Sequence, residues 1–566
     1  MFIEKHLFQP HCYTYTMPKI PLWVFIIVGL LYFTAVRVNT MDVDASQYAE
    51  MSREMMSSHN WLMLYDRGLE YLDKPPFLIW ISALNMKIFG VSNFGYKLPS
   101  ILFGLWAIYA TYRLAKLICG ENTARAAALI LATCQGMFLM TNDIRCDTIL
   151  MSWVITAIWL IKEWDIQKRL PWLMGGFACI GFGMMTKGPI ALMVPVFCFA
   201  TDWALKREWK KFFHWAYLPG IAIIALLLLP MSIGLYQQFD LHPEKIVNGK
   251  TGISGLRFYY WSQSFGRITG ESPWKNGANI SFLLVNMLWS FLPWVFILVP
   301  AIIYNIIALF RQKFRLLPGQ EWITTGGFLL AYFALGSSAY QLPHYIFVAF
   351  PLAAIITAKS VNDFIEGNRY AAMYKVIRPF FNGVILLLLV LVLVLITYVF
   401  PSGIFAVLLW AVCMAAWVWL LLNKKLKGKL VLLPAAGMFC VNIFITNFVY
   451  YQLLGYQVGS QVGTYMNEAQ IPGRSLVVYK MRDPINALNF YYKQMTVTAD
   501  TIVNVRNKTY ILTMDEGLRD LKENNFNYDI IRQGRLFKVS ELTPKFLNPA
   551  TREQALKNYY LVKVKE

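Results

Sequence analysis

The 566-residue chain is poor in charge: only 15% of its residues are Asp, Glu, Lys or Arg, against roughly 25% in globular proteins. Hydrophobic residues make up 57% of it, and the mean hydropathy is +0.45. This composition excludes a single soluble core. The chain also has only eight cysteines, none of them beyond Cys440. Neither a disulfide framework nor a cysteine metal cluster is therefore predicted.

Long apolar runs are what the sequence has in quantity. Runs of about 17 to 25 residues recur along most of it, and this length crosses about 30 Å of hydrocarbon. Because lipid offers no partner to unpaired backbone groups, each run is expected to be helical. Thirteen spans are predicted, near residues 20–38, 97–115, 122–141, 148–162, 171–186, 190–205, 216–235, 279–310, 322–338, 345–358, 380–400, 404–422 and 430–450.

The basic residues indicate how these spans are oriented. The formal charge of +20 is compatible with a nucleic-acid partner, but Lys and Arg cluster at alternate helix ends, as in 206–211 and 424–429. With a cytoplasmic N-terminus these clusters all lie inside, as the positive-inside rule requires. No nucleic-acid partner is therefore predicted.

The apolar stretch 75–89 would invert this topology if it were a fourteenth span, so we expect it to lie in the interface or to re-enter. No small-residue cleavage site follows the first span, which argues against a signal peptide.

The composition changes after Tyr451 to a mixed, soluble pattern. Segments 475–480 and 509–514 are typical of buried strands, 516–525 of a helix, and 528–542 of a further strand. The sequence thus predicts a transmembrane domain at 1–456 and a small α/β domain at 457–566. An odd number of spans places the second domain on the non-cytoplasmic side.

Ionisable residues gather in the loops expected on that outer side. Such groups are costly near a membrane and commonly functional. Carboxylates at two helix ends, with three or four bases from other loops, form a site for a phosphate beside a carbon under attack, since Arg and Lys bind phosphate. The candidate residues are Asp42, Asp44, Tyr48, Arg53, Asp73, Lys74, Asp143, Asp147, Lys187, Arg267, His344 and Tyr345.

Structural explanations compete with this interpretation. The segment 45–58 has Tyr48 and several Met at helical spacing, which is typical of an amphipathic helix lying on the membrane. Asp44 is a candidate helix cap, and the "DVD" around it is a weak match to metal-binding DxD motifs. Asp147 alternatively pairs with Arg145, while long basic side chains such as Lys187 reach towards water without any catalytic role.

Several motifs resemble one known group of enzymes. The motifs are "DASQYAEMSREM" from Asp44, "YLDKPPFLIWISALNMKIFG" from Tyr71, "KLPS" from Lys97, "RCDTILM" from Arg145, "TKGPIALMVP" from Thr186, "FGRITG" from Phe265, "FLPW" from Phe291 and "LPHYIFVAFPLAA" from Leu342. In this order they resemble the bacterial ArnT-like lipid A 4-amino-4-deoxy-L-arabinose transferases and the broader protein mannosyltransferase group. These share the fold of glycosyltransferase superfamily C (GT-C).

The resemblance implies a bacterial inner-membrane enzyme with thirteen spans and a periplasmic C-terminal domain. It implies transfer of a sugar from a polyprenyl phosphate, usually undecaprenyl phosphate, to an acceptor at the outer leaflet. Asp44 and Asp147 match the catalytic acids, and Lys74 matches the donor-phosphate lysine. Lys187, Arg267 and Tyr345 are expected to help bind that phosphate. The remaining candidates are expected to line the cavity, and neither a cofactor nor a metal is expected.

The sequence departs from the family pattern at the residues after Asp44. Relatives commonly read Asp-Glu-x-Arg-Tyr-Ala where this chain has "DASQYA", which removes one acid and one base. The reaction type survives this change, but the sugar and acceptor stay open. Lipid A is the favoured acceptor, and a protein hydroxyl or a glycan is the alternative. A transporter of lipid-linked sugars is a more distant alternative, because transporters usually place ionisable groups at the midplane.

Overall fold

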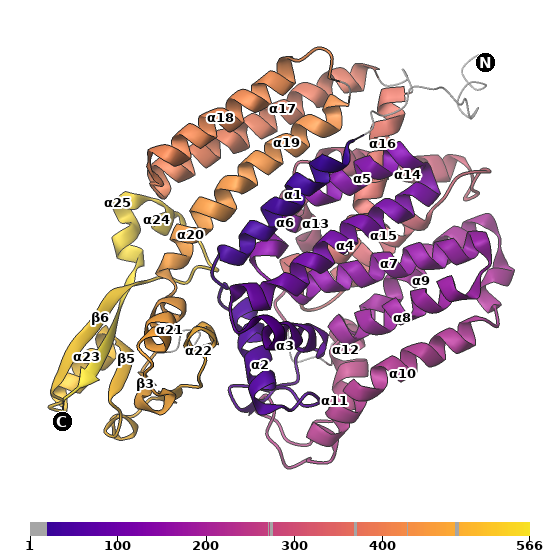
Figure 1. The fold of residues 1–566 in the computed structure, drawn as a ribbon. Helices are drawn as coiled ribbons and strands as arrows, with labels where there is room; N and C mark the ends of the chain where they lie inside the picture. The colour runs from indigo at the N-terminus through magenta and orange to yellow at the C-terminus, as the bar shows by residue number, and fades with distance from the viewer. Residues whose placement is uncertain are drawn as a thin grey trace.

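The computed structural model describes residues 20–269, 271, 275–366, 371–426, 428–481 and 486–565. A large bundle of helices occupies most of the molecule, and a small region that contains strands lies at one end of it (Figure 1). The helices α2 (Asp44–Ser58) and α3 (Phe77–Phe89) lie between this region and the long helices, and α3 packs against one of them, α4 (Asn93–Cys119).

The helices of the first half are α1 Leu22–Thr34, α4 Asn93–Cys119, α5 Glu121–Thr133, α6 Gln135–Asn142, α7 Cys146–Gln167, α8 Leu170–Lys187, α9 Ile190–Lys206 and α10 Tyr217–Leu235. Those that follow are α11 Gly255–Arg257, α12 Phe265–Thr269, α13 Ser281–Ser290, α14 Val295–Arg311, α15 Ile323–Gly336, η5 Pro343–Ala349, α16 Phe350–Glu366, α17 Ala371–Val394, α18 Gly403–Leu422, α19 Lys429–Phe444 and α20 Tyr450–Leu453. A two-stranded hairpin, β1 (Tyr65–Asp66) and β2 (Leu69–Glu70), lies between α2 and α3.

Within the described ranges, six helices are long and apolar enough to cross a membrane, or seven if the bent pair α5 and α6 counts as one span. The predicted total of thirteen is therefore not confirmed. The expected span 122–141 bends by 52° between α5 and α6. The expected span 279–310 is interrupted between α13 and α14, where Pro293 has no backbone N–H to continue a helix. The stretch 75–89 forms α3, whose 13 residues give a length of about 20 Å, less than the hydrocarbon thickness.

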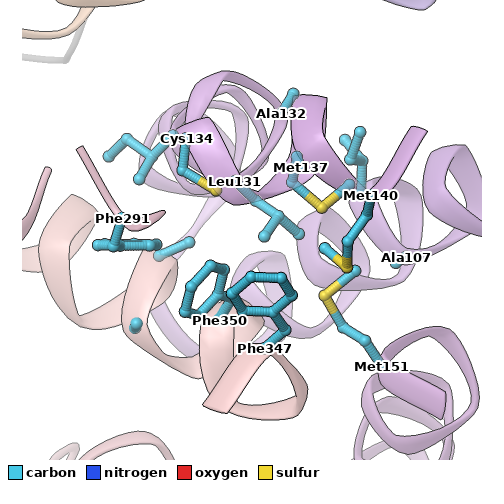
Figure 2. Close-up of a cluster of buried hydrophobic side chains, with 14 of the residues drawn as sticks. Ala107, Leu131, Ala132, Cys134, Met137, Met140, Met151, Phe291, Phe347 and Phe350 are labelled. Atoms are coloured by element: carbon cyan, nitrogen blue, oxygen red, sulfur yellow. The ribbon is translucent and has the colours of Figure 1, made fainter. Parts of the chain in front are cut away.

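Methionine and phenylalanine side chains fill the centre of the bundle. Figure 2 shows Phe347 and Phe350 beneath Met137, with Met151 of α7 close by, and the two rings are 4.8 Å apart between centroids. A Cβ atom on Gly136 would lie 2.8 Å from the Phe350 ring. Phe350 begins α16 directly after η5, and η5 packs against α7, which places residues 344 and 345 near the start of α7.

The C-terminal region folds around a five-stranded sheet in the order β4-β3-β5-β7-β6. Strand β3 is parallel to β4 and β5, whereas β7 is antiparallel to both β5 and β6. All four residues of β3 are buried, as expected for a central parallel strand. The elements are α21 Val458–Glu468, β3 Leu476–Tyr479, α22 Asn486–Tyr492, β4 Val497–Ala499, β5 Tyr510–Met514, α23 Asp515–Glu523, β6 Tyr528–Leu536, α24 Pro544–Leu547, α25 Pro549–Arg552 and β7 Lys557–Val564.

The predicted strands and helix of this region are confirmed as β3, β5, α23 and β6, except that β6 ends at Leu536 and not at 542 as predicted. Helix α2 is also present, but it does not simply lie on a membrane surface. Most of its residues are buried, and it packs against α3 and α22. The C-terminal region thus covers the helix that begins at Asp44, which matters for the site described next.

Candidate active site

The predicted polar residues come from five separate elements that end in one place. Asp44 begins α2, Lys74 precedes α3, Asp147 lies in the first turn of α7, Lys187 ends α8, and Tyr345 lies in η5. Because α7 and α8 pack side by side and run in opposite directions, the start of one lies beside the end of the other. Segments about 300 residues apart in the chain therefore contribute to one site.

Arg145 joins two of the carboxylates. Its guanidinium forms an ion pair with Asp143 at 2.8 Å and a second, shorter one with Asp44. Burial opposes the charge of Arg145, but the two carboxylates raise its pKa above the ordinary value. Burial raises the pKa of Asp143, and Arg145 opposes that rise. The Asp44 side chain keeps 38% of its surface exposed, against 8% for Asp143. Asp44 is therefore the carboxylate of this cluster that opens to the cavity.

Asp147 belongs to a second, more enclosed cluster. Lys187 Nζ donates to Asp147 Oδ1 at 2.5 Å, and His344 Nε2 lies 3.7 Å from Asp147 Oδ2. The same Lys187 ammonium lies 4.1 Å from the centroid of the Tyr345 ring, a cation–π contact. Asp147 pairs with Lys187 and not with its sequence neighbour Arg145.

Lys74 lies where two cavities meet. Its ammonium donates to Asp73 at 2.6 Å; burial opposes its charge, but the Asp73 carboxylate outweighs that effect and raises the pKa of Lys74. A polar cavity of about 370 Å³ is lined by Asp44, Gln47, Tyr48, Asp66, Leu69, Glu70, Tyr71, Leu72, Asp73, Lys74, Arg145, Cys146, Asp147, Asn248, Tyr340, Leu342 and His344. A mainly apolar cavity of about 100 Å³ is lined by Lys74, Leu150, Lys187, Ile190, Met193, Gln263, Ser264, Phe265, Ala334, Leu335, Ser338 and Tyr345.

Carboxylates outnumber cations around the polar cavity. Among the residues that the structure describes, its lining includes five acids, Asp44, Asp66, Glu70, Asp73 and Asp147, and two permanent cations, Lys74 and Arg145. Glu70 has a further partner in Lys245, at 2.7 Å. Cations that do not line this cavity, Arg67, Lys187 and Lys245, pair with Asp66, Asp147 and Glu70, so each of the five acids has a cationic partner. The lining thus offers carboxylate oxygens to polar groups of a ligand, next to an entrance to the apolar cavity where Lys74 and Lys187 favour a negative group.

Three predicted cavity residues do not line either cavity. Asp42 accepts a hydrogen bond from the hydroxyl of Ser46 in α2 at 2.5 Å. Asp143 is buried and pairs with Arg145. Arg53 is buried on the opposite side of α2, where it pairs with Glu50 at 2.6 Å and donates to the Lys493 carbonyl at 3.2 Å. The helical period explains why Arg53 does not reach the cavity. Arg53 lies nine positions after Asp44 on α2, and at that separation the two side chains point in different directions. Arg267 lies in α12, and its side chain is outside the described residues.

Sequence reasoning did not select several lining residues as site residues, among them Gln47, Asp66, Glu70, Asn248 and Tyr340. Arg145 was available from the motif "RCDTILM", and Gln47 from the departure after Asp44. Asn248 and Tyr340 carry no local signal, because only the fold brings their loops to the cavity.

No group of three or more His, Cys, Asp or Glu within the described ranges is placed to hold a metal ion. The two acids of "DVD" serve different purposes: Asp42 bonds Ser46, whereas Asp44 pairs with Arg145. The two carboxylates therefore have different partners in this structure.

Part of the chain is similar in sequence to known proteins. Residues 73–233, which include Lys74, Asp147 and Lys187, match the family of dolichyl-phosphate-mannose-protein mannosyltransferases. An undecaprenyl phosphate-α-4-amino-4-deoxy-L-arabinose arabinosyl transferase of Edwardsiella ictaluri is 26% identical over 324 residues, 56% of this chain and 54% of the relative. The enzyme of the same name from Erwinia tasmaniensis is 28% identical over 258 residues, 44% of each chain. The matches thus span about half the length of these curated relatives.

Solved structures extend the likeness over most of the chain. The crystal structure of ArnT from Cupriavidus metallidurans bound to undecaprenyl phosphate superposes with a TM-score of 0.69 at 16% identity, covering 90% of this chain and 96% of that one. The predicted resemblance is confirmed. The Archaeoglobus fulgidus oligosaccharyltransferase gives a TM-score of 0.50 at 12% identity, covering 87% of this chain and 69% of that one. The GT-C fold predicted from the motifs is therefore the fold observed.

Proposed function

We propose that this protein is an integral membrane glycosyltransferase that moves a sugar from undecaprenyl phosphate to a cell-envelope acceptor, most specifically lipid A. The observation that carries the proposal is the position of Lys74, at the junction of a polar and an apolar cavity. A lipid-linked sugar has a polar head, an apolar tail and a phosphate between them. The two cavities and the lysine match these three parts in order.

The donor phosphate is assigned to Lys74 and Lys187, with Arg267 and Tyr345 as further contacts. Lys187 is held between Asp147 and the Tyr345 ring, so its ammonium is already oriented before a ligand arrives. Oriented charge in a site of low water content is usually the largest contribution to catalysis. These cations stabilise the polyprenyl phosphate as it leaves.

The reaction is one displacement at the anomeric carbon. The bond from that carbon to the phosphate oxygen breaks, and its electron pair stays on the phosphate. An acceptor oxygen forms the new bond. If that oxygen belongs to a hydroxyl, Asp44 takes its proton. If it belongs to a lipid A phosphate, which is ionised at neutral pH, Asp44 instead stabilises positive charge on the sugar ring.

The carboxylates that line the polar cavity support an amino sugar as the transferred group. An ammonium group on the sugar would find acceptor oxygens in the polar cavity, and the names of the curated relatives contain such a sugar, 4-amino-4-deoxy-L-arabinose. The family match to protein mannosyltransferases supports a second candidate with the same donor chemistry, in which a protein hydroxyl is the acceptor.

A bacterial inner-membrane location follows from this proposal, with the N-terminus cytoplasmic and the residues from about 457 onward forming a periplasmic domain. The course of α9 supports this orientation. It begins at Ile190, beside the site, and ends at Lys206, where the basic segment 206–211 starts. Seventeen residues separate the two ends by about 25 Å, so this basic segment lies on the side away from the site.

The test is transfer of 4-amino-4-deoxy-L-arabinose from its undecaprenyl phosphate to lipid A by the purified protein in vesicles. We expect Lys74→Ala to lower the rate about 100-fold or more. Lys87→Ala, on exposed α3 surface, is the matched control and should keep full rate. Full activity of Lys74→Ala would refute the assigned phosphate site. Mass spectra of lipid A that are identical in cells with and without the gene would favour the protein acceptor.

A further inference from the structure

The segment between α1 and Asp44 is held mainly by parts of the protein far from it in sequence. Residues 38–43 form neither a long helix nor a strand, so their backbone groups need partners elsewhere. On the membrane side, the buried Lys97 ammonium donates to the carbonyls of Val38 at 2.8 Å and Asn142 at 3.1 Å. On the outer side, the partners come from the C-terminal region.

Gln457 bonds this segment at two points. Its Nε2 donates to the Thr40 carbonyl at 2.9 Å, and the Asp42 N–H donates to its Oε1 at 2.9 Å. Gln457 is only 3% exposed and immediately precedes α21. A side-chain amide that both donates and accepts fixes the position and the direction of the peptide it holds. Glutamate cannot donate, and asparagine is one methylene shorter.

Tyr491 supplies a second attachment. The Thr40 N–H donates to the Tyr491 hydroxyl at 2.7 Å, and that hydroxyl donates to Asn93 Oδ1 at 2.6 Å. The neighbouring Phe490 is buried in one apolar cluster with Tyr48 and Ala49 of α2. Tyr491 thus lies in α22, which packs on α2, and Gln457 immediately precedes α21, which packs on α22.

The held segment is joined directly to the first turn of α2. The Ser46 N–H donates to the Met41 carbonyl at 3.1 Å, and the Asp42 carboxylate accepts from the Ser46 hydroxyl at 2.5 Å. Asp44 stands between these contacts, and its carboxylate meets Arg145. Any displacement of residues 40–42 therefore moves Asp44 relative to the cavity.

We propose that the C-terminal domain is a positioning element of the active site, in which Gln457 and Tyr491 hold residues 40–42 and thereby set the place of Asp44. Neither residue lines the cavities described above, so each acts through Asp44. The catalytic consequence rests on the proposed function, whereas the ordering of residues 40–42 does not. A misplacement of about 1 Å can cost roughly 100-fold in rate.

The first experiment measures order without activity. Gln457→Ala and Tyr491→Phe, each in the full-length protein, are compared by hydrogen–deuterium exchange. We expect amides in residues 40–47 to exchange at least about 10-fold faster in both variants, since lost attachments permit local opening. Gln461→Ala, whose side chain accepts from Tyr559 at 2.8 Å, and Tyr492→Phe, whose hydroxyl donates to Ile471 at 2.7 Å, are matched controls within the C-terminal region. Unchanged exchange in Gln457→Ala and Tyr491→Phe, or an equal rise in the controls, overturns the proposal.

The second experiment measures transfer. We expect Gln457→Ala to lower kcat about 10- to 100-fold, with the donor KM within about 3-fold of wild type, because the phosphate contacts are untouched. In an Asp44→Asn background the same change should cost less than about 3-fold, since residues that act as a unit are not additive. An undiminished effect in that background overturns the route through Asp44. Absence of transfer by the wild-type protein refutes the proposed function instead, and the exchange result then still decides whether the C-terminal residues order this segment.

Discussion

The two charged clusters of the site differ in how far each is closed. In the first, Arg145 bridges Asp44 and Asp143, and the Asp44 side chain is 38% exposed. In the second, Lys187 holds Asp147, whose side chain is 3% exposed. A carboxylate that is enclosed by its partner orients that partner, whereas a carboxylate that opens to a cavity can meet a ligand. Both acids are predicted to be catalytic from the sequence; from this difference we propose instead that Asp44 serves the chemistry and that Asp147 orients Lys187.

The largest expected effect is on Asp44. Asp44→Asn should lower kcat about 100- to 10,000-fold, the range for loss of a positioned acid or base. Stability should change little, because the side chain is partly exposed and Arg145 keeps Asp143 as a partner. Steady-state transfer and thermal unfolding measure the two effects. Asp529→Asn, on the exposed surface of β6, is the control; a large loss of stability in Asp44→Asn would reverse the assignment.

Asp147→Asn should act mainly on stability and donor binding. It leaves the Lys187 ammonium enclosed without its carboxylate, which costs about 3 kcal/mol of unfolding free energy when a buried pair is broken. The donor KM should rise, because Lys187 loses its orientation. The double variant Asp147→Asn/Lys187→Met should recover most of the stability but not the donor affinity. Wild-type stability in Asp147→Asn would show that the two clusters do not differ as described.

Arg145→Lys sharpens the comparison within the first cluster. A guanidinium contacts both Asp44 and Asp143 through separate nitrogens, whereas an ammonium is a single point charge. We expect a fall of about 10-fold in kcat with the fold retained, because charge is kept but geometry is lost. The pH–rate profile and thermal unfolding are the readouts. A rate equal to that of wild type would mean that charge alone matters at this position.

The smallest expected effect concerns the far face of α2. Burial raises the pKa of Glu50 to about 7, and Arg53 opposes the rise. A carboxyl whose pKa is raised in the folded state stabilises below its unfolded pKa of about 4.3 and loses this contribution as the pH rises through the folded value. Unfolding free energy measured between pH 5 and 8 should therefore decline through this group, and Glu50→Gln should flatten the decline. An unchanged slope in Glu50→Gln would show that Glu50 is ionised throughout.

Prediction from sequence succeeded where the signal was local. Apolar periodicity located most of the long helices, and turn residues with β-branched runs located β3, β5 and β6. Prediction failed where packing interrupts a helix, as at the bend between α5 and α6. The motifs also selected Asp44, Lys74, Asp147, Lys187 and Tyr345, which do meet at one site. They selected Arg53 as well, although it lies on the side of α2 that the C-terminal region covers. The sequence of α2 alone does not indicate which of its sides is covered.

The sequence by itself determined the class of this protein, because a shortage of charge and repeated apolar runs allow only helices in lipid. It also determined which polar residues stand at helix ends. Only the tertiary structure decided how these residues pair, with Arg145 on Asp44 and Lys187 on Asp147, and that Lys74 lies between a polar and an apolar cavity. The tertiary structure alone also decided that residues 40–42 are attached to Gln457 and Tyr491. Such contacts join positions up to 451 residues apart, and the direction of a side chain across that separation is set by packing and not by neighbours in the chain.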